Sequence, residues 1–77
     1  MRKTRATPAY ARLTTALKEA RLKAGLQQIE AARKLRKPQS FVSKVESGER
    51  RLDVIELAEL LRAYGQDVIG FLRSLQL

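Results

Sequence analysis

Apolar residues in this sequence recur at intervals of three and four, in short segments that end at glycines or polar turn residues. One such series is Leu13, Leu17, Ala20 and Ala24, which Tyr10 extends by a turn. No segment of useful length alternates between apolar and polar residues. Intervals of three and four place side chains on one face of an α-helix, whereas alternation is typical of a strand. The spacing therefore predicts an all-α fold, a compact bundle of about five short helices.

Capping residues and helix breakers set the bounds that we expect. Thr7 before Pro8 is typical of a helix start, and a glycine often ends a helix because it accepts a positive φ angle. Asp53 and Glu56 have the spacing of a capping box. The expected helices cover residues 8–24, 28–35, 38–47, 54–64 and 68–75.

The expected core lies on the inward faces of these helices. Beyond the first helix, its members are Ala31, Ala32, Leu35, Phe41, Val42, Val45, Val54, Leu57, Ala58, Leu61 and Tyr64, with Ile55 and Leu60 widening the last series.

The charge of the chain is strongly basic and uneven. The formal net charge is +8, and the basic residues concentrate in residues 1–12 and 33–51, whereas acidic residues outnumber basic ones from residue 52 onward. This distribution favours a polyanionic partner such as nucleic acid. The alternative is that these charges are solvated and serve solubility.

Several classes of protein are excluded by what the sequence lacks. Without cysteine or histidine it has no disulfide, no thiolate or histidine metal site, and no catalytic triad built on those residues. Charged residues such as Arg12 and Lys18 interrupt any signal peptide, and no apolar run suits a membrane span. We expect a cytoplasmic, non-enzymatic protein without a cofactor. Residues 1–6 are expected to be a disordered basic arm, and residues 7–77 a single domain.

The segment from residue 25 to residue 50 carries the functional information. Two short helices joined by about three residues cross steeply, which exposes the second helix to a DNA major groove. The segment resembles the phage-repressor and Cro-like helix-turn-helix family, called the Xre type, over residues 10–65. The matching features are Gly25-Leu26, Gln28, Ala32, Val42, Val45, Glu46 and Gly48. The resemblance implies a lambda-repressor-like DNA-binding fold.

Residues around the third helix are the candidate DNA contacts. The resemblance implies that base edges are read by Gln39, Ser40, Ser43 and Lys44. The candidates for phosphate contacts are Gln28, Lys37, Arg50 and Arg51. The alternatives are an ordinary polar helix face, local helix caps and a solvated basic loop.

Two further positions matter for the geometry of the motif. Arg21 matches a family position that pairs with the acid at Glu46, and such a pair would tie the first helix to the third. Arg36 occupies a turn position where the family usually has glycine, so a positive φ angle there would be strained.

The C-terminal helix carries more apolar residues than one small helix needs in order to dock. They are Ile69, Phe71, Leu72, Leu75 and Leu77. The resemblance implies a two-fold homodimer built at this end, with its two reading helices one DNA turn apart on a palindromic operator. The alternative is that these side chains all pack inside the monomer.

The leading function is a sequence-specific transcriptional regulator of double-stranded DNA, as a repressor or autoregulator. One alternative is an antitoxin that neutralises a toxin partner and represses its own operon. Another is a restriction–modification controller protein. A membrane binder is disfavoured because the apolar faces are consumed by helix packing.

Overall fold

The computed structural model describes residues 7–76, and all regular structure in that range is helical. The helices are α1 Pro8–Lys23, α2 Gln28–Leu35, α3 Gln39–Ser47, α4 Val54–Ala63 and α5 Val68–Leu75. The all-α prediction is confirmed, and the observed bounds depart from the expected ones by no more than one residue. The expected arm at residues 1–6 and the side chain of Leu77 lie outside the described residues.

Side-chain caps begin the helices where the sequence predicts them. The Thr7 hydroxyl accepts a hydrogen bond from the Tyr10 N–H at 3.1 Å, and the Asp67 carboxylate caps α5 in the same way. At the start of α4, the Asp53 carboxylate accepts from the Glu56 N–H at 2.7 Å, and the Glu56 carboxylate accepts from the Asp53 N–H at 3.1 Å. These bonds satisfy backbone donors that no helical carbonyl reaches.

The turn between α2 and α3 contains the strained residue that the sequence indicated. Arg36 has a φ angle of 59° and a ψ angle of 43°, in the left-handed region. Its N–H donates to the Arg33 carbonyl at 3.1 Å, and the Lys37 N–H donates to the Ala32 carbonyl at 3.0 Å. These two bonds close α2 as a glycine-ended helix would close, and they hold a conformation that costs a non-glycine residue about 1 kcal/mol.

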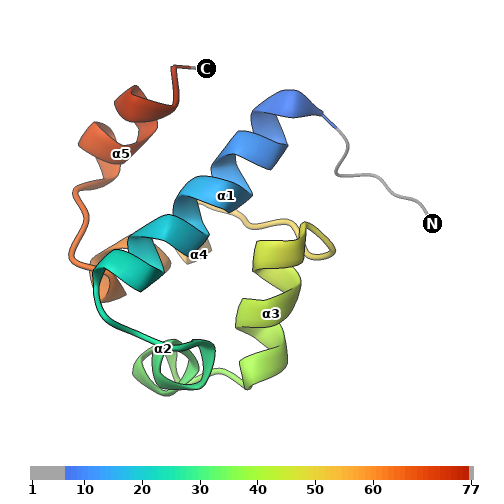
Figure 1. Cartoon of the computed structure of the whole chain (residues 1–77), viewed down its shortest axis with the longest axis vertical. Coiled ribbons are helices and arrows are strands. Elements are labelled where there is room, and N and C mark those ends of the chain that lie inside the picture. The colour runs from blue at the N-terminus through green and yellow to red at the C-terminus, as the bar shows by residue number, and fades with distance from the viewer. Residues whose placement is uncertain (1–6, 77) are drawn as a thin grey trace.

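Figure 1 shows α1 running across the centre of the molecule, with α5 on one side of it and the α2–α3 pair on the other. α2 packs against α3 and α4, and α1 packs against α3 and α5. α3 consequently stands at the periphery, where one of its sides is held by the bundle and the other side is open (Figure 1).

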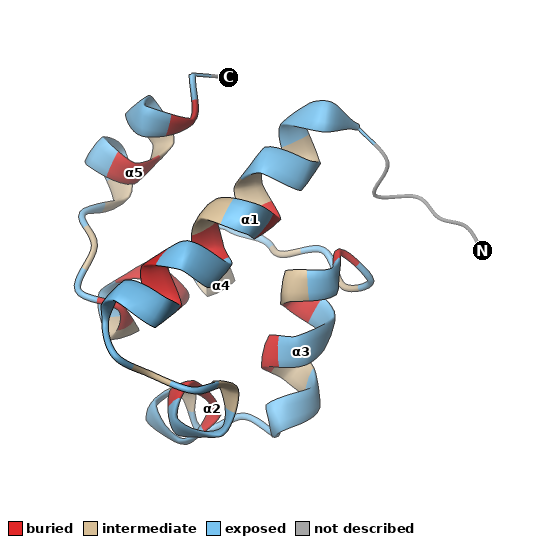
Figure 2. Cartoon of the chain, in the orientation of Figure 1, coloured by how far each residue is buried: buried red, intermediate tan, exposed pale blue. Residues whose placement is uncertain are grey.

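The core draws side chains from all of these helices, as the buried positions in Figure 2 show. Its members are Leu17, Ala20, Ala31, Ala32, Val42, Val45, Leu57, Leu60, Leu61, Tyr64, Phe71 and Leu75. The predicted core was wrong at Ala24, Val54 and Ile55, which are exposed. Ala24 caps the end of α1, Val54 is the first residue of α4, and Ile55 shares a helix face with the exposed Glu59 and Arg62. Helical spacing identifies a face, but it does not say where along the helix the cover ends.

Candidate nucleic-acid interface

The open side of α3 is polar, whereas its inner side is apolar. Val42 and Val45 are each 1% exposed and anchor the helix in the core. The predicted base-reading residues are all exposed, and they are Gln39, Ser40, Ser43 and Lys44. Gln39 and Ser43 are four residues apart and share one face of an α-helix, as do Ser40 and Lys44, and the two pairs are adjacent on the exposed part of α3.

A buried ion pair joins α1 to α3. The Arg21 Nε donates to Glu46 Oε2 at 2.6 Å, and Nη2 donates to Oε1 at 3.1 Å, so the contact is bidentate. Both side chains are only 6% exposed, and Arg21 Nη1 also donates to the Leu26 carbonyl at 2.7 Å. The hydrogen bond with Glu46 raises the pKa of the Arg21 guanidinium, although burial alone would lower it. The pair fixes the position of α3 relative to α1.

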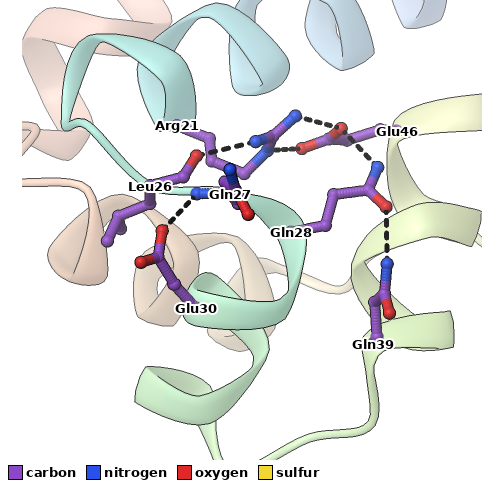
Figure 3. A network of polar contacts seen from close by, with 7 residues as sticks. All are labelled: Arg21, Leu26, Gln27, Gln28, Glu30, Gln39 and Glu46. Carbon is purple, nitrogen blue, oxygen red and sulfur yellow. Dashed lines mark hydrogen bonds and ion pairs between the residues drawn. The ribbon is translucent and has the colours of Figure 1, made fainter.

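The same carboxylate is the start of a chain of amides that reaches the outer face of α3. Gln28 Nε2 donates to Glu46 Oε1 at 3.0 Å, and Gln28 Oε1 accepts from Gln39 Nε2 at 3.4 Å (Figure 3). A carboxylate can only accept, so it directs the Gln28 amide nitrogen inward and leaves the Gln28 oxygen facing Gln39. The buried pair thereby orients the first residue of α2 and the first residue of α3.

The loop between α3 and α4 carries Arg50 and Arg51, and both lie against aromatic rings. Arg50 Nη2 donates to Glu56 Oε2 at 2.8 Å and Nη1 to Glu56 Oε1 at 3.0 Å. Its guanidinium also lies 4.9 Å from the centroid of the Phe41 ring. The Arg51 guanidinium lies 4.3 Å from the centroid of the Tyr10 ring.

Lys37, like Arg50, lies close to the Phe41 ring. Its Nζ lies 5.3 Å from the centroid of the Phe41 ring, so Phe41 has cations from both the α2–α3 turn and the following loop. Both contacts are within the range of a cation–π attraction. The structure therefore places Gln28 beside one end of α3 and Arg50 and Arg51 after its other end.

Two comparisons identify the family. A profile described as helix-turn-helix matches residues 17–71. The solved structure of an XRE-family like protein from Pseudomonas syringae pv. tomato str. DC3000 is 48% identical, covers 88% of this chain and 83% of that chain, and superposes with a TM-score of 0.84. The chain belongs to the Xre-type helix-turn-helix family. At that level it is a DNA-binding transcriptional regulator.

Two more distant structures share the fold of this helix-turn-helix protein. They are the restriction-modification controller protein C.Esp1396I in its wild-type form and as a mutant, with 20% and 22% identity. Both have TM-scores of 0.81 and cover 90% of this chain, and the chain covers 91% of the wild type and 87% of the mutant. No curated protein sequence matches the chain.

Sequence reasoning did not anticipate the aromatic and acidic partners of the basic loop in this family member. The sequence indicates Tyr10 only as a core residue, Phe41 only as an apolar position of its helix, and Glu56 only as part of a cap. The available signal is weak, because an aromatic residue on a basic surface indicates a contact without saying which cation it meets. Tyr10 and Arg51 are far apart in the chain, so only the fold brings them together.

Only some of the residues predicted for dimerisation are exposed in the described range. Phe71 and Leu75 are 6% and 7% exposed and belong to the core, so they offer little surface to a second copy. They are buried because α5 packs on α1 and α4 within the same chain. Ile69 is 60% exposed and Leu72 is half-buried, and these two remain on the outer side of α5.

Two further features, a metal-binding group and a membrane-spanning helix, are absent from the described residues. Residues 7–76 contain no group of three acidic, cysteine or histidine side chains arranged to hold a metal ion. No helix in the same range is both long enough and apolar enough to cross a bilayer.

Proposed function

We propose that this helix-turn-helix protein is a repressor or autoregulator that binds a palindromic operator in double-stranded DNA as a homodimer. α3 lies in the major groove, where its outer face reads base edges through Gln39, Ser40, Ser43 and Lys44. A glutamine amide suits adenine, and a lysine suits guanine. The function is binding without catalysis, carried out in the cytoplasm.

The observation that carries this proposal is the fixed polar face of α3. Val42 and Val45 hold the helix from within, and the Glu46 carboxylate orients Gln28, which in turn contacts Gln39. Because the orientation of α3 and of its first side chain is fixed before binding, the helix loses little conformational freedom when it enters the groove.

Phosphate contacts are proposed on both sides of the reading helix. Gln28 is the first residue of α2, where backbone N–H groups and the helix dipole favour an anion. Positive charge on the other side of the reading helix comes from Lys37, Arg50 and Arg51. Such contacts position a protein on the duplex without reading its sequence.

The homodimer is proposed to form through the outer side of α5. The exposed Ile69 and the partly buried Leu72 are three residues apart on that side, and both leave apolar surface open to a second copy. A two-fold axis there would repeat α3 at a spacing of about 34 Å, one turn of DNA.

Selection of bound duplexes from a random pool tests the reading of DNA. We expect an inverted repeat with half-sites about one helical turn apart. Gln39→Ala should then weaken binding to the selected site by about tenfold or more and leave nonspecific binding nearly intact. Gln66→Ala, in the loop between α4 and α5, is the matched control. Equal losses on selected and random DNA would remove Gln39 from the reading face.

Sedimentation equilibrium tests the dimer. Ile69→Glu should convert the dimer to a monomer, whereas Leu22→Glu changes an exposed apolar residue of α1 and should leave the mass unchanged. An identical mass for the wild type and Ile69→Glu would refute an interface on α5. A reporter gene under the selected site then distinguishes repression from activation.

A restriction–modification controller is the second candidate. It is supported by the fold that the chain shares with two controller structures. Their sequence identities of 22% and 20% are evidence of the fold alone. Genes for a methyltransferase and a nuclease beside this one would favour it, and their absence would leave the general regulator.

A further inference from the structure

The adjacent residues Arg50 and Arg51 have opposite surroundings, although both carry a guanidinium on the same loop. Arg50 is paired with a carboxylate of the same chain although its side chain is 42% exposed, whereas Arg51 is exposed and rests on an aromatic ring. The difference separates two roles that the sequence alone assigns equally.

Arg50 uses its donors within the chain. Nη1 donates to the Arg51 carbonyl at 2.8 Å and to Glu56 Oε1 at 3.0 Å, and Nη2 donates to Glu56 Oε2 at 2.8 Å. Its guanidinium also lies 4.9 Å from the centroid of the Phe41 ring. Glu56 neutralises the charge of Arg50 and also closes the cap on Asp53, so Arg50 ties the loop to the start of α4.

Arg51 has no such engagement. Its guanidinium donates no hydrogen bond to another residue of the described range. The Cζ atom of that guanidinium lies 4.3 Å from the centroid of the Tyr10 ring. A guanidinium stacked by its face keeps its N–H groups along the outer edge, where a phosphate can be met by two of them.

Tyr10 holds the loop in two ways. Its ring supports the Arg51 side chain, and its hydroxyl donates to the Arg50 carbonyl at 3.4 Å. Tyr10 lies in the first turns of α1, so the start of the chain's first helix braces the loop that follows the reading helix. A long side chain held in place before binding loses less freedom on contact.

We propose that Arg51 is the loop residue that contacts a DNA phosphate, that Arg50 is its internal brace, and that Tyr10 is a positioning residue that holds Arg51 ready for the contact. The proposal rests on the proposed function and refines it, since it removes Arg50 from the phosphate contacts.

The salt dependence of affinity for a selected or random duplex tests the division. The slope of log K against log salt concentration is negative, and each lost phosphate contact lowers its magnitude by about 0.9. Slopes are compared below by this magnitude. Arg51→Ala and Tyr10→Leu should both lower the slope, and they should weaken binding about threefold to tenfold at low salt. Tyr10→Phe keeps the ring and should keep the slope. Arg50→Met should leave the slope unchanged even where affinity falls, and Lys23→Ala, beside α5, controls for loss of charge alone.

The outcomes separate this inference from the function that it refines. A wild-type protein that binds no duplex would end the proposed function itself. Wild-type binding with an unchanged slope in Arg51→Ala and Tyr10→Leu would overturn the inference alone. A slope that falls in Arg50→Met as it does in Arg51→Ala would overturn it too, as would a Tyr10→Phe variant that behaves like Tyr10→Leu.

Discussion

Two arginine–glutamate pairs of the same chemistry occupy opposite environments in this protein. Arg21 and Glu46 meet at 2.6 Å with both side chains 6% exposed. Arg50 and Glu56 meet at 2.8 Å with side chains 42% and 17% exposed. Each contact is bidentate, so geometry does not distinguish them. The two pairs differ instead in how far water reaches their side chains.

The comparison shows that burial decides what an ion pair does for the molecule. Water replaces a lost partner at the surface, so an exposed pair contributes little to stability and is screened by salt. A buried charge that loses its partner has no such replacement, and its removal from water is no longer compensated. Arg21 and Glu46 therefore hold the fold and orient α3, whereas Arg50 and Glu56 locally shape a loop.

The largest expected effect comes from leaving Arg21 without its partner. Glu46→Gln should lower the free energy of unfolding by about 3 kcal/mol, because a buried guanidinium then faces a neutral amide. Urea unfolding followed by circular dichroism measures it. Replacing both partners, with Arg21→Met and Glu46→Leu together, should recover most of the loss. A loss well below 1 kcal/mol in Glu46→Gln would mean that the two pairs do not differ as burial predicts.

Tyr64 gives a second, intermediate effect and a reporter of the buried pair. Burial raises its pKa to about 12, and the charge of Glu46 adds to the increase while Arg21 opposes it. The neutral hydroxyl is therefore favoured in the folded state. This contribution is fully present below pH 10, the ordinary tyrosine pKa, and is lost as the pH rises through about 12.

Ultraviolet titration of tyrosinate in a Tyr10→Phe background isolates this group. Tyr64→Phe should remove the alkaline loss of stability, and Glu46→Gln should lower the pKa of Tyr64. Glu56→Gln should not shift it, since Glu56 is not among the groups that act on Tyr64. A shift of equal size in both glutamate variants would erase the contrast between the pairs.

The exposed pair gives the smallest effect, and its signature is dependence on conditions. The hydrogen bond from Arg50, followed by that from the Asp53 N–H, holds the pKa of Glu56 below its ordinary value. This contribution to stability is present above the ordinary pKa near 4.5 and is lost as the pH falls through the lowered value. Glu56→Gln should flatten that acid limb of the stability curve.

Arg50→Met should shift the unfolding midpoint far less than Glu46→Gln does, and high salt should abolish the shift. A salt-insensitive loss would indicate that this pair is not behaving as a surface pair.

The sequence by itself determined the helices and the character of the reading face. Caps at Thr7, Asp53 and Asp67 act within one turn of the chain, so local composition is sufficient to predict them. The spacing of Val42 and Val45 likewise leaves Ser40, Ser43 and Lys44 on the other side of α3.

Only the tertiary structure decided which apolar and charged side chains meet. Ile55 and Phe71 are equally apolar in the sequence, yet one faces solvent and the other lies in the core. Arg50 and Arg51 are neighbours with the same side chain, yet one is paired with Glu56 and the other rests on Tyr10. The reason is physical: helix caps depend on neighbours within a few residues, whereas burial and pairing depend on segments that only folding brings together.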